Sequence, residues 1–347
     1  MSWAGSGRAA QLLDSWIAYF HAVGGQPELA VQECAAIAAK TPNLYGNQAI
    51  WALALEKQKK YAEAISHYDR ALRIESKCLE ALRRRGWCHM MIYNHALALT
   101  DYNAVLAVEP DDQPTILDRA MEYHNSQKYK QAIDDCRRVI EINGKNEFAW
   151  GQLGDLQAHL KQWKEAHASA SQAINLAPTF TDAYQTRAWA DQEMGNSVEA
   201  LADLTAAIAS DPTCDAAYYS RGYLYRDQKQ YDKSIADLSE AIKIDPSNPF
   251  YFCARGCAEV RNGNNRQAIA DCTRSIAIAP HRTHPYLSRG EAYNNSGYYD
   301  LALLDLNHVI DHDSSNVEAL TERSKVYGIL EKRKLAARAM ARSQPRK

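Results

Sequence analysis

Two cysteines spaced by about one helical turn are the residues of this sequence best suited to chemistry. Cys253 and Cys257 are four residues apart, so on a helix both thiols would share one face, where they could bind one metal ion or form a redox pair. No CxxC motif accompanies them, and the nearest histidines, His281 and His284, fall in the following turn. We therefore predict that these cysteines are two small side chains of a helix face and that the chain binds no metal and no other cofactor.

Motifs of the common enzyme classes are missing from the sequence. There is no glycine-rich phosphate loop, nucleophile elbow or pair of catalytic carboxylates. His159 and His167 flank Trp163 without an HExxH motif, which favours ordinary surface histidines. The aspartate pairs at 111–112, 134–135 and 311–313 fall at expected helix starts, in turns or on a helix surface. The sequence predicts a protein that is not an enzyme.

Charge and hydropathy exclude several classes of partner. The net charge is −2, so the chain as a whole does not attract nucleic acid or an anionic membrane. No run of about 18 apolar residues is present, and Asp14 interrupts what would be a poor secretory signal. The eight cysteines show no paired metal-type spacing, and several fall where a helix core needs a small apolar residue. We expect buried thiols and a cytoplasmic location.

A repeat of 34 residues organises the chain. Tyr61, Tyr129 and Tyr231 begin three similar segments and are separated by 68 and 102 residues, two and three times that period. Blocks of this length follow one another without insertion or deletion. We expect an N-terminal extension over residues 1–10 and then one solenoid domain over 11–347, whose blocks are 11–44, 45–78, 79–112, 113–146, 147–180, 181–214, 215–248, 249–282, 283–316 and 317–343, the last with a basic capping tail.

Small residues recur at two positions of the block, where helices would cross. Position 8 is Ala or Gly in every block except the last, which has Ser324, and position 20 is Ala in every block except one, which has Ser234. Bulky residues fill position 4 from the third block on, and would pack between neighbouring blocks. Proline at position 32 of six blocks ends a helix, and Asp or Asn beside it can cap the next one. Each block is predicted to be helix A, a tight turn, helix B and a short connection.

This pattern resembles the tetratricopeptide repeat family, and the resemblance covers residues 11 to 343. It implies an all-α fold, a right-handed superhelical solenoid in which helix A lines the concave face. The first two blocks depart from the pattern at position 4, where they carry Asp14 and Gln48.

Arginine at position 7 and aspartate at position 23 occur together in the same blocks. Blocks three, four, six, seven, eight and nine have both residues, as in the pair Arg221 and Asp237. The second block has Trp51 with His67 and the fifth has Leu153 with Ser169 at the same two positions. We predict a ladder of ion pairs that joins helix A to helix B within each block. The alternative is a row of arginines that binds an acidic ligand.

Positions 2, 5, 9, 12 and 13 of helix A share one face, which the family resemblance places in the concave groove. In several blocks these positions supply aromatic and methionine side chains, which are typical of peptide-binding surfaces. The predicted binding residues are Arg83, Trp87, Met90, Met91, Leu117, Met121, His124, Phe148, Trp189, Tyr219, Tyr223 and Phe250. Trp87 and Trp189 are the favoured anchors. The alternative for each residue is burial by neighbouring helices.

Known peptide-binding patterns of the family are not matched. Members that hold the C-terminal carboxylate of Hsp70 or Hsp90 tails carry Lys at position 5 and Asn at position 9, followed by Asn, Lys and Arg in the next two blocks. No three consecutive blocks here fit that clamp, and no asparagine ladder follows position 6. We predict a scaffold or adaptor that binds a protein or peptide partner in the groove, and no nucleic acid or membrane.

Two alternatives stay open at this point. A regulatory subunit would engage an enzyme or complex through its convex or end surfaces, and groove substitutions would leave that contact intact. The basic C-terminus, with seven Lys and Arg between Lys332 and Lys347, is expected to be the polar end of the solenoid. A targeting or nucleic-acid-binding tail is the alternative for this segment.

Overall fold

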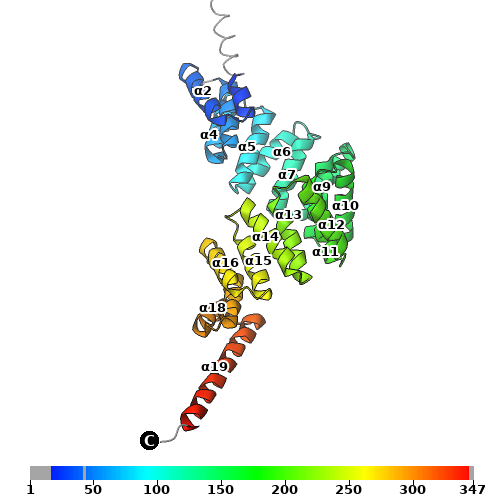
Figure 1. The fold of residues 1–347 in the computed structure, drawn as a ribbon. Coiled ribbons are helices and arrows are strands. Elements are labelled where there is room, and N and C mark those ends of the chain that lie inside the picture. The colour runs from blue at the N-terminus through cyan, green and yellow to red at the C-terminus, as the bar shows by residue number, and fades with distance from the viewer. Residues whose placement is uncertain (1–16, 42–43, 344–347) are drawn as a thin grey trace, which may run out of the picture. The chain divides into compact units, whose positions relative to one another are not determined.

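The computed structural model describes residues 17–41 and 44–343 of the chain, and every regular element in these ranges is a helix. The all-α fold class predicted from the repeat is therefore confirmed. The expected N-terminal extension, together with Asp14 and Pro42, lies outside the described residues. Figure 1 shows the helices following one another along the chain.

The chain divides into two compact units, residues 1–178 and 179–347, and the division falls next to the boundary of the fifth and sixth blocks. In the N-terminal unit a helical segment at 17–23 precedes α2 (Pro27–Lys40), α3 (Tyr45–Lys57), α4 (Tyr61–Ile74), α5 (Leu79–Met91), α6 (His95–Leu106), α7 (Gln113–Asn125), α8 (Tyr129–Ile142), α9 (Glu147–His159) and α10 (Trp163–Leu176).

The C-terminal unit consists of α11 (Thr181–Glu193), α12 (Ser197–Ser210), α13 (Asp215–Asp227), α14 (Tyr231–Ile244), α15 (Pro249–Arg261), α16 (Asn265–Ile278), α17 (His284–Asn295), α18 (Tyr299–His312) and α19 (Val317–Ser343). In both units helix A and helix B of a block pack as a hairpin, except in the last block, and successive hairpins stack within the unit.

The turn between helix A and helix B uses the left-handed backbone region at position 15 of the first nine blocks. Glycine occupies this position in four blocks, for example Gly263 with φ 85°. In five others a residue with a Cβ adopts the same conformation, for example Lys229 with φ 60°. The left-handed region is open to glycine at no steric cost but costs other residues free energy.

The two small-residue positions form the crossing point of each hairpin, as predicted. Side chains at position 20 from Ala30 to Ala302 are buried, and the glycines at position 8 lie directly against helix B. A Cβ placed on Gly256 would be 2.7 Å from the sulfur of Cys272, and one on Gly222 would be 2.9 Å from Leu238 Cγ. Larger side chains would push the helices apart.

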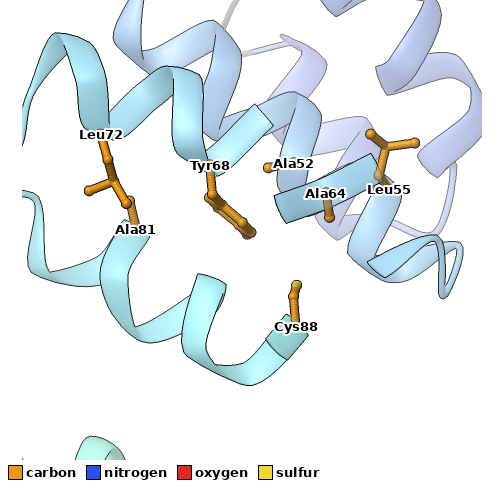
Figure 2. Packing of buried hydrophobic residues seen from close by; sticks show 7 residues of the cluster. All are labelled: Ala52, Leu55, Ala64, Tyr68, Leu72, Ala81 and Cys88. Atoms are coloured by element: carbon orange, nitrogen blue, oxygen red, sulfur yellow. The ribbon is translucent and has the colours of Figure 1, made fainter. Parts of the chain in front are cut away.

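The core lies between three successive helices rather than inside one hairpin. Figure 2 shows this for α3, α4 and α5, where Tyr68 and Leu72 of α4 lie among residues of the helices on either side. Cys34, Cys136 and Cys272 occupy position 24, the equivalent of Tyr68, and all three are fully buried as predicted. Burial raises the pKa of the Cys34 and Cys136 thiols to about 12, so these thiols are inert.

The predicted ladder of intra-block ion pairs is present in all six blocks that carry both residues. In each pair the arginine Nε and one Nη donate two parallel hydrogen bonds to the two carboxylate oxygens, at 2.6–2.9 Å. The pairs are Arg85–Asp101, Arg119–Asp135, Arg187–Asp203, Arg221–Asp237, Arg255–Asp271 and Arg289–Asp305. The aspartates are almost fully buried, so the pairs hold helix A against helix B.

The ladder also links neighbouring blocks, which the sequence analysis did not foresee. The remaining Nη of the arginine donates to a polar side chain at position 25 of the preceding block, as Arg221 does to Thr205 at 3.2 Å and Arg255 to Ser239 at 3.0 Å. Where the second block lacks the ion pair, Trp51 and His67 stack with ring centroids 4.2 Å apart. A flat aromatic pair thus replaces the bidentate pair at the same crossing.

Helix starts follow the predicted capping. The side chains of Asp112, Asn146, Asn248 and Asn316 each accept a hydrogen bond from a backbone N–H in the first turn of the helix that follows.

The final block departs from the predicted hairpin. It does not turn at position 15, and α19 is one uninterrupted helix from Val317 to Ser343. Strong helix formers from Leu330 to Lys334 replace the turn.

Candidate peptide-binding face

The candidate site is the set of helix A positions 2, 5, 9, 12 and 13, which we call the A-face. In the N-terminal unit its arginine is already paired. The Arg83 guanidinium donates to Asp118 at 3.1 Å and to Glu80 at 2.9 Å. Because these carboxylates satisfy Arg83, it is a structural link between α5 and α7 more than a ready site for an acidic ligand.

Trp87 and the methionines of the A-face differ in how deeply they are buried. Trp87, Met91 and Met121 are half-buried and pack against a cluster formed by Met90, Ala98 and Tyr102. Met90 is only 2% exposed, so the prediction that it lines the groove is wrong. Position 12 of α5 points toward α6 of the same hairpin, where Ala98 and Tyr102 cover it.

Leu117 and Phe148 show the same contrast. Leu117 is half-buried against the core that includes Ile116 and Val139. Phe148 is 56% exposed at the start of α9. Of these two, Phe148 presents the larger apolar surface on the A-face.

His124 belongs to a small polar and aromatic cluster on the A-face of α7 and α9. Its Nδ1 lies 3.5 Å from Asp155, whose other oxygen lies 3.8 Å from His159 Nε2. The rings of His159 and Tyr129 stack with centroids 5.5 Å apart. Burial lowers the pKa of His124. His159 is therefore part of an ordered group, where an isolated surface histidine was expected.

In the C-terminal unit three predicted residues come together around one pocket. Trp189, Tyr219 and Tyr223 line an opening of about 300 Å³ between α11 and α13, which we call the aromatic pocket. Gln185, Gln192 and Ser220 also line it and add hydrogen-bonding groups. Rings of Tyr219 and Tyr251 lie 5.2 Å apart, so the Tyr219 side chain is held in place.

A second opening, of about 420 Å³, lies on the A-face of α13, α15, α17 and α19, and we call it the thiol pocket. It carries charges of both signs, because Arg226 and Arg261 face Glu291, Glu318 and Glu322. Arg261 and Glu291 form an ion pair at 2.5 Å. All of these charged residues except Glu322 occupy A-face positions, and none was among the predicted binding residues.

Arginines also cover two aromatic rings of this unit. The Arg226 guanidinium lies 3.9 Å from the ring centroid of Tyr223, and that of Arg282 lies 3.7 Å from the ring centroid of Phe250. Phe250 is nevertheless 45% exposed, at the start of α15. Cation–π contacts of this kind fix the rings without removing them from solvent.

Cys253 and Cys257 lie on the A-face of α15 beside the thiol pocket. Cys253 is buried and Cys257 is half-buried, and all eight cysteines of the chain are free thiols. Hydrogen bonds from Cys253, His284 and Ser288 lower the pKa of Cys257, and the contact with Cys257 raises the pKa of His284. The expected small side chains thus face a histidine from α17, the helix A of the next block.

The sequence matches family models at three places. Models of the tetratricopeptide repeat match residues 51–114, 115–146 and 216–248, in both units. The chain contains tetratricopeptide repeats. Family members of this kind generally mediate contacts between proteins, and their scaffold is generally not enzymatic.

Individual relatives share the tetratricopeptide repeat fold with this chain at low identity. Mouse sperm-associated antigen 1 is 28% identical over 101 residues, which is 29% of this chain and 11% of that protein. A tetratricopeptide repeat protein from Parabacteroides merdae has a TM-score of 0.62 at 21% identity and covers 71% of this chain and 98% of its own. A chain of the APC/C hetero-tetramer Cut9–Hcn1 has a TM-score of 0.63 at 12% identity, over 87% of this chain and 59% of that one.

These likenesses establish the tetratricopeptide repeat fold and leave the ligand open. Because the chain spans about a ninth of sperm-associated antigen 1, the activity of that whole protein is not transferred. Within the described residues, none of the helices of this tetratricopeptide repeat chain has the length and apolar character needed to cross a membrane.

Proposed function

We propose that this chain is a non-enzymatic interaction scaffold that binds an extended peptide segment of a partner protein on the A-face of its C-terminal unit. The observation that carries the proposal is the aromatic pocket of Trp189, Tyr219 and Tyr223. These residues come from consecutive helices A and open to solvent at one place.

The size and lining of the aromatic pocket suit one bulky apolar side chain of a peptide. Trp and Tyr are enriched among the residues that dominate binding energy, since they bury large rigid surfaces. Gln185, Gln192 and Ser220 at the rim can hydrogen-bond the peptide backbone on either side of that side chain. A polar rim around an apolar centre is typical of protein interfaces.

The N-terminal unit offers less for such a ligand. Arg83 is paired with two carboxylates, and Met90 is buried. Trp87 lies against the core of its own hairpin. We therefore assign the main anchor to Trp189 and give Trp87 a secondary role.

A peptide display selection against the immobilised full chain tests this function. Peptides selected by the wild-type chain are then measured against Trp189→Ala and against Phe148→Ala, which removes an exposed aromatic ring from the other unit. The proposal expects loss of binding with Trp189→Ala and unchanged binding with Phe148→Ala. If the selected peptides bind the Trp189→Ala variant as tightly as wild type, the aromatic pocket is not the site.

The same selection separates the alternative of a regulatory subunit that uses its convex or end surfaces. Such a subunit would yield ligands that compete with each other but are insensitive to Trp189, Tyr219 and Tyr223. That result would move the binding surface off the A-face.

A further inference from the structure

We infer that Cys253, Cys257 and His284 form a zinc-binding site at the wall of the thiol pocket. This inference is independent of the peptide-binding function proposed for the aromatic pocket. It also reverses the expectation of no metal site, which placed His284 in the following turn and not against the two thiols.

The His284 nitrogen lies from each of the two sulfurs at close to the separation that one zinc ion requires. His284 Nδ1 is 3.3 Å from Cys253 Sγ and 3.8 Å from Cys257 Sγ. All three atoms lie within 4.8 Å of one another. An ion about 2.3 Å from sulfur and about 2.0–2.1 Å from nitrogen, at a tetrahedral angle, places the two ligand atoms about 3.6 Å apart. The observed distances bracket this value.

Regular elements hold the ligands, so the site does not depend on a flexible loop. Cys253 and Cys257 are one turn apart on α15, and His284 is the first residue of α17, the helix A of the next block. In block terms they occupy positions 5 and 9 and then position 2. One hairpin thus supplies the two cysteine ligands and the next hairpin supplies the histidine. A bound ion would bridge α15 to α17.

The ligand types select a thiophilic ion. Two thiolates and one imidazole form a set that suits zinc, whereas magnesium and calcium prefer oxygen ligands. Two thiolates also neutralise the two charges of the ion. Ser288 Oγ lies 3.1 Å from Cys257 Sγ, where its hydroxyl can donate a hydrogen bond to the thiolate.

The fourth coordination position faces the thiol pocket. A tetrahedral site with three protein ligands keeps one position for water or for a group of another molecule. The pocket of about 420 Å³ lined by Cys257, His284 and Glu318 gives that position access to solvent. A partner side chain with a free thiol, imidazole or carboxylate could fill it.

A second group, His124, Asp155 and His159, provides an internal comparison. Its ligand atoms also lie close together, with 3.5 Å between His124 and Asp155. Here the imidazoles also form ring contacts with Tyr129 and with each other, and no thiolate is present. The inference is restricted to the cysteine site, and His124 serves as a control.

Cobalt and zinc titration of the full chain tests the site. The protein is reduced, stripped of metal with a chelator and titrated with Co²⁺, and Zn²⁺ is then added in competition with a chromophoric chelator. Cys257→Ser and His284→Asn are the test variants. Cys136→Ala, which removes a buried thiol of the other unit, and His124→Ala are the controls. Circular dichroism checks that each variant keeps its helices.

We expect the wild type and both controls to bind one equivalent of Co²⁺ with a thiolate-to-cobalt charge-transfer band in the near ultraviolet. Cys257→Ser should weaken that band and His284→Asn should lower zinc affinity at least about tenfold, the size of loss typical of perturbed metal sites. Absence of the band in the wild type would overturn the inference. So would a band that both test variants retain, or a Cys253–Cys257 disulfide that forms in place of metal binding.

Discussion

Arg221 and Asp237 are joined by two parallel hydrogen bonds of 2.8 Å each, from Nε to one carboxylate oxygen and from Nη2 to the other. The pair lies where helix A and helix B of one block cross, next to Gly222. Arg221 also reaches Thr205 of the preceding block. One side chain therefore connects both helices of its own hairpin and the helix B before it.

Removing the acid of this pair should be costly. Asp237→Ala leaves the half-buried Arg221 charge without its carboxylate and with Thr205 as its remaining hydrogen-bond acceptor, so we expect the free energy of unfolding to fall by about 2–4 kcal/mol. Urea denaturation followed by circular dichroism measures the loss. Asp227→Ala is the matched control, because Asp227 pairs with Arg226 at the surface, and about 0–1 kcal/mol is expected there.

The double exchange of the pair separates a specific interaction from a general loss of polarity. Arg221→Asp with Asp237→Arg should recover most of the stability that either single reversal loses, since the bond is remade in the opposite sense. Strictly additive losses would show that the two side chains act independently.

The left-handed backbone at position 15 leads us to expect opposite changes in the free energy of unfolding from two substitutions. Lys229→Gly places glycine at φ 60° and should raise the free energy of unfolding by about 0.5–1 kcal/mol, while Gly263→Ala at φ 85° should lower it by about 1 kcal/mol. A Cβ on Gly263 would meet open space, so its loss would come from the backbone alone. The account of this turn fails if Lys229→Gly destabilises the chain or Gly263→Ala leaves it unchanged.

Acid should weaken the N-terminal unit through His67. Burial lowers the pKa of His67 from 6.5 to about 4, while its ring stacks on Trp51 and shares a hydrogen bond with Gln48 at 2.8 Å. The folded state therefore binds fewer protons than the unfolded state between these values, and stability falls as the pH drops from about 6.5 toward 4.

Replacement of the imidazole tests this linkage. His67→Phe keeps a ring on Trp51 but cannot titrate, so the loss of stability between pH 7 and pH 5 should shrink by about 1–2 kcal/mol, allowing for the partial exposure of the site. His281→Asn changes an exposed histidine and should leave the pH dependence as in wild type. An undiminished loss in His67→Phe would assign the effect to other groups.

Contacts between the two helices of one block could be predicted from the sequence, whereas contacts between neighbouring blocks could not. The crossing of positions 8 and 20, the buried thiols at position 24 and the pairing of Arg221 with Asp237 all followed from columns of residue types. The acceptors at position 25 did not, because Thr, Ser, Asn and Asp alternate there and form no single column.

The site was harder to predict than the fold because it also depends on how neighbouring helices pack. Met90 fits the A-face by spacing, yet its depth depends on how closely α6 approaches α5. His284 lies 31 residues after Cys253, and only the stacking of α15 against α17 places its ring beside the two thiols. The single helix α19 shows that the period alone does not make a hairpin when strong helix formers occupy the turn.

Calorimetric titration of a display-selected peptide into the full chain is the most direct test of binding at the aromatic pocket. Wild type and Phe148→Ala should bind with the same Kd, and Trp189→Ala should lose about 2 kcal/mol or more, roughly a thirtyfold weaker Kd, as for a central aromatic anchor. Equal affinity of wild type and Trp189→Ala for every selected peptide would contradict the proposal that this face is where the protein binds its partner.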